Sequence, residues 1–303
     1  MRFSDTVADG SRAAVLDVGC FSAHLLVVER CPSQRIASYK VRLRLDQVID
    51  QSGRITTDGI ELISDAVRTV ERRLRTVRAS TFLPFATSSV RDAANAAEVV
   101  DTVARRTGVT LRFLSGRAEA DLAYRAVRHW CRPTGPLAVL DVGGGTVEIA
   151  LGDGPRPEFA CSLPLGARTL TRAGLTDERN LAEARALLHR RIEEAIPPEV
   201  ATRLARARTA GCSKVFESLA KLTGTNPLRV EEVSAWVPRL AALPPHRRAE
   251  LPGISPHRAG QALAGAVIAE TLMRVTGHAA IDICPWSTRE GVLLSLLEER
   301  GVS

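Results

Sequence analysis

In the first half of the chain, segments with apolar residues at helical spacing alternate with short apolar runs that are typical of strands. Residues 60–77 carry apolar side chains three or four positions apart, which predicts an amphipathic helix. The predicted order of this half is helix 60–77, strand 81–86, helix 95–106 and strand 110–114. Because helices alternate with strands, we expect a mixed or parallel sheet with helices packed on it.

The second half has more helical periodicity. Its predicted helices cover residues 122–130, 178–196, 215–222, 230–243, 261–275 and 288–299, with a late strand at 279–283. Pro133, Gly135 and Pro136 form a break between the halves. We therefore expect two domains, 1–125 and 126–303, and allow for the final helix, about 288–303, packing back on the first.

A short repeat links the two halves. The sequence Val-Leu-Asp-Val-Gly occurs at residues 15–19 and again at 139–143. Ser22 then corresponds to Thr146, and each is followed by a second apolar run. Each copy predicts a strand, a tight turn and a second strand, so the chain is interpreted as an internal duplication.

Composition narrows the class of protein. With 303 residues, 45% hydrophobic and 25% charged, the chain has the balance of a globular protein and not of a disordered or fibrous one. Aromatic residues make up only 4%, which disfavours a nucleic-acid binder that stacks bases on rings. We expect no specific nucleic-acid partner.

The net charge is +7, from 41 Lys and Arg against 34 Asp and Glu, and all basic residues except Lys40, Lys214 and Lys221 are arginines. Arginine suits forked contacts with phosphate oxygens, so an anionic partner is one interpretation. A codon bias toward arginine is the other.

The cysteines and the N-terminal segment bear on location. The six cysteines include no C-x-x-C pair and no His partner at zinc-finger spacing. Residues 1–15 lack the pattern of a signal peptide, and no stretch of 18 residues is free of charge. We expect a cytoplasmic chain with reduced thiols and no membrane partner.

The second copy of the repeat carries the strongest candidate site. Asp141 is followed by Val142 and three glycines, whose backbone can approach an anion and point N–H groups at it. A merely flexible turn is the alternative. Glu148 lies on the returning strand, so the hairpin could bring it and Asp141 to one magnesium ion, unless both are ordinary solvated acids.

Three further segments offer weaker candidates. The first copy, residues 17–22, has one glycine, a serine and Phe21, which is either a wall of the site or, more simply, a packing aromatic. Residues 86–95 combine hydroxyls, a helix start and an arginine, as an anion site or a capped helix would. Glu119, in residues 115–120, either faces the site or is a common first-turn acid.

Taken together, these segments resemble the Ppx/GppA family of exopolyphosphatases and guanosine pentaphosphate phosphohydrolases. The segments that carry the resemblance are 17–22, 86–95, 115–120, 141–148, 162–167, 258–259 and 289–291. Residues 25–28, 213–216 and 283–286 are similar to the short actinobacterial exopolyphosphatases with two lobes. Departures from the family pattern are Phe21 in place of Asn, Ala118 in place of an acid and Gly260 in place of Asp.

The resemblance implies an α/β fold of two duplicated lobes like those of actin, Hsp70 and sugar kinases (ribonuclease H-like), with an active-site cleft between the lobes. It implies Glu119 as general base, Asp141 and Glu148 as ligands of Mg²⁺ or Mn²⁺, and Lys214 and Arg258 along a polyphosphate channel. The implied phosphate-binding residues are Asp17, Gly19, Ser22, Ser88, Ser89, Arg91, Gly143, Gly144, Gly145 and Thr146.

The implied activity is metal-dependent hydrolysis of the terminal phosphoanhydride of inorganic polyphosphate, including short chains, or of guanosine pentaphosphate (pppGpp), by a homodimer. Two alternatives stay open. One is an ATP-dependent kinase or ATPase of the same superfamily, and the other is a sensor that binds polyphosphate or alarmone with little turnover.

Overall fold

A computed structural model describes residues 12–299, which divide into two compact units. Among these residues, the first unit comprises 12–114 together with 292–299, and the second comprises 115–291. The sequence placed this division near residue 125, which lies inside a helix of the second unit. Glu119 consequently belongs to the second unit.

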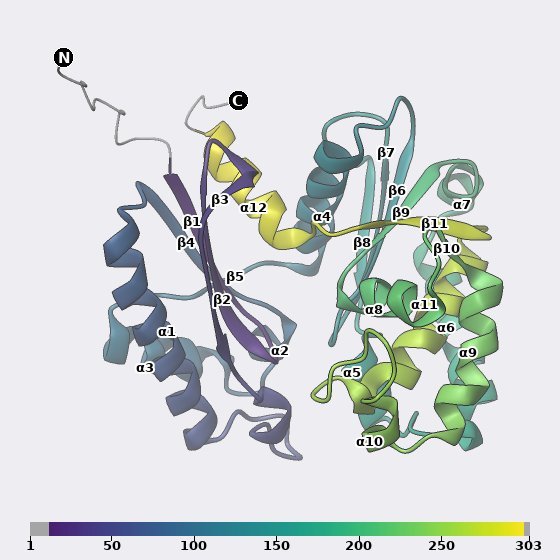
Figure 1. The fold of residues 1–303 in the computed structure, drawn as a ribbon, viewed down its shortest axis with the longest axis horizontal. Helices are drawn as coiled ribbons and strands as arrows, with labels where there is room; N and C mark the ends of the chain where they lie inside the picture. Colours follow the sequence, from purple (N-terminus) through teal and green to yellow (C-terminus); the bar gives the residue numbers. More distant parts are fainter. Residues whose placement is uncertain (1–11, 300–303) are drawn as a thin grey trace. The chain divides into compact units, whose positions relative to one another are not determined.

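The first unit is built on a five-stranded sheet in the order β3-β2-β1-β4-β5. Its strands are β1 (Arg12–Val18), β2 (Ser22–Glu29), β3 (Cys31–Arg42), β4 (Thr81–Ala86) and β5 (Arg112–Phe113). β1 and β2 form an antiparallel hairpin that continues into β3, whereas β4 and β5 run parallel to β1. Helices α1 (Thr57–Val77) and α3 (Ala96–Thr107) pack side by side on one face (Figure 1). The short elements are η1 (Leu45–Gln47) and α2 (Ser88–Arg91).

The second unit contains a six-stranded sheet in the order β10-β11-β9-β6-β7-β8. Its strands are β6 (Leu137–Val142), β7 (Val147–Gly152), β8 (Phe159–Leu163), β9 (Arg208–Cys212), β10 (Leu228–Arg229) and β11 (Ala280–Cys284). Its helices are α4 (Gly116–Cys131), α5 (Ala167–Arg172), η2 (Glu178–Asn180), α6 (Leu181–Ala195), α7 (Pro198–Leu204), α8 (Lys214–Thr223), α9 (Val230–Ala242), α10 (Pro245–Arg248), η3 (Ala259–Gln261) and α11 (Ala262–Val275). α12 (Thr288–Glu298) begins in this unit and ends in the first.

The two sheets share one topology, which confirms the duplication. In each, a hairpin and a third antiparallel strand are followed by two parallel strands: β3-β2-β1-β4-β5 corresponds to β8-β7-β6-β9-β11. The repeated Val-Leu-Asp-Val-Gly segments form the same strand of each copy and enter the same turn.

Side chains of β6 alternate between the two faces of the second sheet, as the period of a strand requires. Leu137 and Val139 pack with α4, whereas Ala138, Leu140 and Val142 join the larger core formed with α5, α6, α8, α9 and α11. Both faces are covered, which explains why this strand is an unbroken apolar run up to its aspartate.

The turn after β6 is held by the first residues of α5. The backbone N–H groups of Gly166, Ala167 and Arg168 donate to the carbonyl oxygens of Gly145, Gly143 and Gly144, at 3.0, 3.0 and 2.8 Å. A trans peptide unit points its N–H opposite to its C=O. The N–H groups of the same three peptide units, which are those of Gly144, Gly145 and Thr146, therefore point away from α5.

Most predicted elements are confirmed. Strand β4 and helices α1, α3, α8, α9 and α11 lie within one to three residues of the predicted limits. The prediction missed β3, β8 and β9 and the short helices α5 and α7, and it began α4 six residues late. Among residues 12–299, no helix is long and apolar enough to cross a membrane.

The close contact between α5 and the turn predicts that adding a methyl group at Gly166 destabilises the protein. A Cβ at Gly166 would lie 2.4 Å from the carbonyl carbon of Gly145, where only backbone could move. We expect Gly166→Ala to destabilise the protein by about 1–3 kcal/mol. Thermal unfolding should show a fall of about 2–4 °C for each kcal/mol.

Gly135→Ala is the matched control, because a Cβ there meets nothing within 4 Å. Equal melting temperatures for the two variants would contradict the close packing of α5 on the turn.

Candidate active site

Two carboxylates lie opposite each other on neighbouring strands. The antiparallel register of β6 and β7 pairs Asp141 with Glu148, so both side chains project from the sheet face that α4 covers. Both are buried, at 8% and 5% exposure. The sequence prediction that this hairpin brings the two acids together matches this register.

Glu119 comes to the same face from α4. Ser115 caps this helix by accepting a hydrogen bond from the N–H of Ala118 at 3.2 Å, which places Glu119 in the first turn. Glu119 is buried, and its charge is close enough to raise the pKa of Glu148. Its backbone carbonyl accepts a hydrogen bond from the Thr288 hydroxyl. The structure therefore gathers three acids within one unit.

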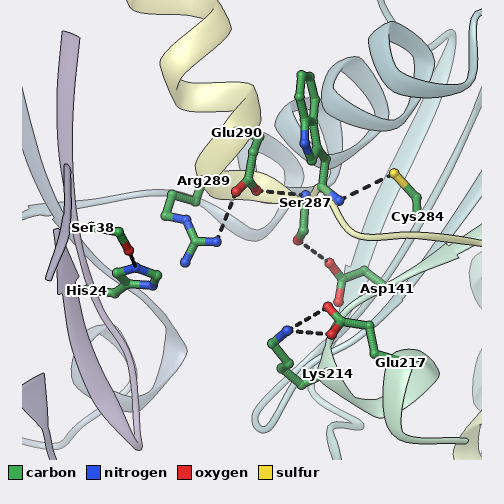
Figure 2. A network of polar contacts seen from close by, with 10 residues as sticks. His24, Ser38, Asp141, Lys214, Glu217, Cys284, Ser287, Arg289 and Glu290 are labelled. Atoms are coloured by element: carbon green, nitrogen blue, oxygen red, sulfur yellow. Dashed lines mark hydrogen bonds and ion pairs between the residues drawn. The ribbon is translucent and has the colours of Figure 1, made fainter. Parts of the chain in front are cut away.

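Three neutral side chains orient the carboxylates of β6 and β7. Oδ2 of Asp141 accepts hydrogen bonds from the Ser287 hydroxyl at 2.8 Å and from the Cys212 thiol at 3.3 Å. Oε1 of Glu148 accepts one from the Ser162 hydroxyl at 2.7 Å. Figure 2 shows Ser287, in the turn after β11, directed at Asp141. Because these donors carry no charge, they orient the acids without neutralising them.

The acids are costly to ionise in this environment. Burial raises the pKa of Asp141 to about 6, although the hydrogen bonds from Ser287 and Cys212 act in the opposite direction. Burial, followed by the charges of Asp141 and Glu119, raises the pKa of Glu148 well above its usual value. A cation at these oxygens would favour the ionised forms of both.

The donor set fits a hard cation in part. Carboxylate oxygens are ligands that Mg²⁺ and Mn²⁺ accept, and Asp141 and Glu148 provide them side by side. Among residues 12–299, no group of three or more His, Cys, Asp or Glu side chains is arranged to hold a metal ion. An ion held by two carboxylates would complete its shell with water and phosphate oxygens, as Mg²⁺ commonly does.

The glycine turn next to Asp141 has the features of an anion site. Its three carbonyl oxygens are bonded to α5, so the oxygens that would repel an anion are occupied. The buried guanidinium-bearing residue Arg168 lies beside it, since a Cβ at Gly144 would be 3.7 Å from Nη1 of Arg168. Thr146 is buried at the end of the turn.

The first unit brings together a second group of predicted residues. Asp17 is the next-to-last residue of β1, and the N–H of Gly19 donates to the carbonyl of Ser22 at 3.0 Å to close the turn. Ser88 and Ser89 are buried on α2, directly after β4, which is parallel to β1. Hydroxyls of α2 and the first turn thus lie at the same end of one sheet.

Other residues of the first unit have structural partners. Arg91 donates to the carbonyl of Leu114 at 2.8 Å and pairs with Asp92 at 2.7 Å. Asn95 exchanges two hydrogen bonds with the backbone of Ile55. Phe21 is buried in the core of the first unit, where it packs.

Lys214 and Arg258 lie on the walls of one cavity in the second unit, bordered by Gly143 and Gly144. Nζ of Lys214 pairs with the Glu217 carboxylate at 2.5 Å (Figure 2).

The sequence analysis did not identify the residues that surround the predicted site residues and donate hydrogen bonds or lie next to them. Ser287 lies 146 positions from the aspartate that it contacts. Cys212 was not among the predicted site residues, yet it pairs with Asp141 in the parallel register of β6 and β9. Arg168 follows the quoted segment 162–167 directly, and its position after a glycine at the start of a helix is a signal that could have identified it.

Comparison with known proteins finds relatives over nearly the full length. An uncharacterised protein of Streptomyces coelicolor is 40% identical over 305 residues, covering 95% of this chain and 91% of the relative. Exopolyphosphatase 1 of Mycobacterium tuberculosis is 37% identical over 310 residues, covering 95% of this chain and 88% of the relative.

Solved structures agree in fold. An exopolyphosphatase from Cytophaga hutchinsonii aligns with a TM-score of 0.80 at 21% identity, over 95% of this chain and 98% of that one. The Aquifex aeolicus PPX-GPPA enzyme aligns with a TM-score of 0.79 at 23% identity, over 94% and 99%.

The family model of the Ppx/GppA phosphatases matches residues 27–300. This match confirms the resemblance inferred from the motifs, and it runs through both units of the structure. The whole chain therefore belongs to the Ppx/GppA phosphatase family, whose members are hydrolases.

Proposed function

We propose that this protein is an exopolyphosphatase that removes the terminal phosphate of inorganic polyphosphate, with pppGpp as a second substrate that has the same terminal anhydride. The observation that carries the proposal is the convergence of Glu119, Asp141 and Glu148 beside a glycine turn whose carbonyls are bonded to α5. Homodimer formation and a cytoplasmic location belong to the same proposal.

Glu119 is the general base in this mechanism. It accepts a proton from a water molecule that attacks the terminal phosphorus in line with the bridging oxygen. The bond between phosphorus and that oxygen breaks, and the shortened polyphosphate leaves with the bonding electrons. Because this leaving group is a stable anion, the reaction needs no strong general acid.

The turn binds the phosphate that is transferred. The backbone N–H groups of Gly144, Gly145 and Thr146 stabilise the charge on the equatorial oxygens of this phosphate. Arg168, beside the turn, adds positive charge. Preorganisation by α5 means that little reorientation is needed when the substrate binds.

Asp141 and Glu148 are the residues that would hold a divalent ion. Such an ion supplies charge neutralisation to the phosphate oxygens. Ser287, Cys212 and Ser162 fix the orientation of the two carboxylates and leave other lone pairs available. The ligand set suits Mg²⁺ or Mn²⁺.

Removal of the base should abolish most turnover. We expect Glu119→Gln to lower kcat for polyphosphate by about 10²–10⁴ with little change in the melting temperature, because the shape is kept and the proton acceptor is lost. Phosphate release from tripolyphosphate, longer chains and pppGpp measures this effect. Glu183→Gln, at an exposed position on α6, is the control. Turnover by Glu119→Gln at the wild-type rate would refute the assignment.

The raised pKa of Asp141 predicts a pH-dependent stability. Its pKa of about 6 in the folded protein exceeds the ordinary value of 3.8, so its contribution to stability is most favourable below pH 4 and is lost as pH rises through 6. With chelator at pH 7.5, we expect Asp141→Asn to be more stable than the wild type by about 1–3 kcal/mol, and the difference to shrink toward pH 4.

Added Mg²⁺ should stabilise the wild type and not Asp141→Asn, because the variant lacks one of the two charges. Thermal unfolding with and without chelator measures both effects. A pH-independent difference between the two proteins would contradict the burial of a charged Asp141.

A further inference from the structure

Two cysteines of the second unit are in contact where helix α4 ends beside strand β11. Cys131 is the last residue of α4, and Cys284 is the last residue of β11. Their thiols are hydrogen-bonded to each other. Aromatic rings pack the end of α4 against the turn after β11. The ring of Trp286 stacks on His129, with 5.6 Å between the ring centroids, and is tilted against Trp130 at 5.3 Å. The structure therefore holds the two thiols together.

The two thiols differ in exposure and in charge. Cys131 is partly exposed, whereas Cys284 is buried. The pKa of Cys131 is lowered to about 7, first by the hydrogen bond from Cys284 and then, against the effect of burial, by the Arg208 guanidinium. Asp282, which pairs with Arg208 at 2.8 Å, acts in the opposite direction. The pKa of Cys284 is raised, first by the same hydrogen bond and then by burial. Cys131 is thus the thiol that ionises, and Cys284 is its hydrogen-bond donor.

The other four cysteines have different surroundings. Cys20 is buried in the core of the first unit, and the thiol of Cys31 is hydrogen-bonded to the Ser33 hydroxyl at 2.9 Å. Burial raises the pKa of Cys161 to about 11 and that of Cys212 well above its usual value. A thiolate that a small oxidant can reach, in contact with a second thiol, is typical of cysteine pairs that oxidise reversibly.

We propose that hydrogen peroxide oxidises Cys131 and Cys284 to a disulfide, and that this bond lowers the activity of the neighbouring site. The Cys131 thiolate attacks one peroxide oxygen and the O–O bond breaks, which leaves a sulfenic acid and a hydroxide that takes a proton from water. The Cys284 sulfur then attacks the Cys131 sulfur. The S–O bond breaks, and the hydroxyl group leaves with the thiol proton as water. Two thiols lose two electrons in total, and one peroxide is reduced to two waters.

The turn after β11 connects the cysteine pair to the acids. The backbone N–H of Trp286 donates to Sγ of Cys284 at 3.4 Å, and the hydroxyl of the next residue, Ser287, donates to Asp141 at 2.8 Å (Figure 2). A covalent S–S bond is much shorter than a hydrogen-bonded contact between two sulfurs, so Cys284 moves toward α4 when the disulfide forms. The turn moves with Cys284, and Ser287 no longer holds Asp141 in the same orientation.

Alkylation followed by mass spectrometry of the full chain tests the disulfide without any turnover. The reduced protein is treated with hydrogen peroxide, the remaining thiols are blocked with iodoacetamide, and the peptides are compared before and after addition of dithiothreitol. We expect peptides that contain Cys131 and Cys284 to be linked and to separate in dithiothreitol. A peroxide-treated protein without this link, or with Cys131 converted only to the sulfinic or sulfonic acid, would overturn the proposal.

Phosphate release from tripolyphosphate measures the effect of the disulfide on the site. We expect peroxide to lower kcat of the wild type by at least about tenfold, and dithiothreitol to restore it, because a small displacement of an orienting group is costly to the rate. Cys131→Ser should keep the basal rate and lose the sensitivity to peroxide. Cys31→Ser, at a partly exposed cysteine of the first unit, is the matched control and should be as sensitive as the wild type. Equal inactivation of Cys131→Ser and the wild type would contradict the assignment.

The two measurements separate this proposal from the proposed phosphatase function, on which its effect on activity rests. Turnover by the reduced protein without a disulfide after peroxide would overturn the oxidation site and leave the phosphatase proposal intact. A disulfide in a protein that has no turnover when reduced would count against the phosphatase and support the oxidation site. Complete disulfide formation with unchanged kcat would refute the connection from Cys284 to Asp141.

Discussion

The hydrogen bonds between α5 and the glycine turn are the constraint on which the second unit's chemistry depends. Three successive carbonyls accept bonds from three successive N–H groups, and Gly166 must lack a side chain for the two backbones to meet. A flexible run of three glycines is thereby held in one conformation. The entropy that glycine loses on ordering is offset by contacts made within the fold, before any ligand is present.

Three buried carboxyl groups lie close to that turn, and burial makes the ionisation of two of them, Asp141 and Glu148, unfavourable. Asp141 and Glu148 are buried side by side with Glu119 nearby, and their hydrogen-bond partners are neutral hydroxyl and thiol groups. A site designed only for stability would place an arginine against these acids. Their pKa values are raised because burial is not offset by a positive charge, and in the proposed mechanism a divalent cation supplies that charge.

Much of this arrangement could be predicted from the sequence, because it depends on local pattern. The repeat, the hairpin and its glycines lie within a few positions of one another, and the strand period alone places Asp141 and Glu148 on one face. The contacts that set their environment could not be predicted in this way. Ser287 reaches Asp141 only because β11 lies beside β9 in the sheet, and a sheet order of this kind is not encoded in any short segment.

The missed elements have a similar explanation. In β3, exposed positions alternate with partly buried ones. Because many of its residues are charged or small, the sequence does not show a clear apolar face, although the strand packs on α1. β9 is a short buried run with glycine and alanine, which carries little strand propensity of its own and is stabilised by β6 and β11 on either side.

The two hairpins show what a duplication copies. Each turn is closed by the same bond, from Gly19 to Ser22 at 3.0 Å and from Gly143 to Thr146 at 2.9 Å. The register that pairs Asp141 with Glu148 pairs Asp17 with His24, and His24 contacts Ser38 on the third strand as Glu148 contacts Ser162. Since backbone bonds alone preserve the shape, one copy could exchange an acid for an imidazole while the other kept both acids. The two hairpins thus have the same backbone structure but different side chains at these paired positions, one acid in the first hairpin and two in the second.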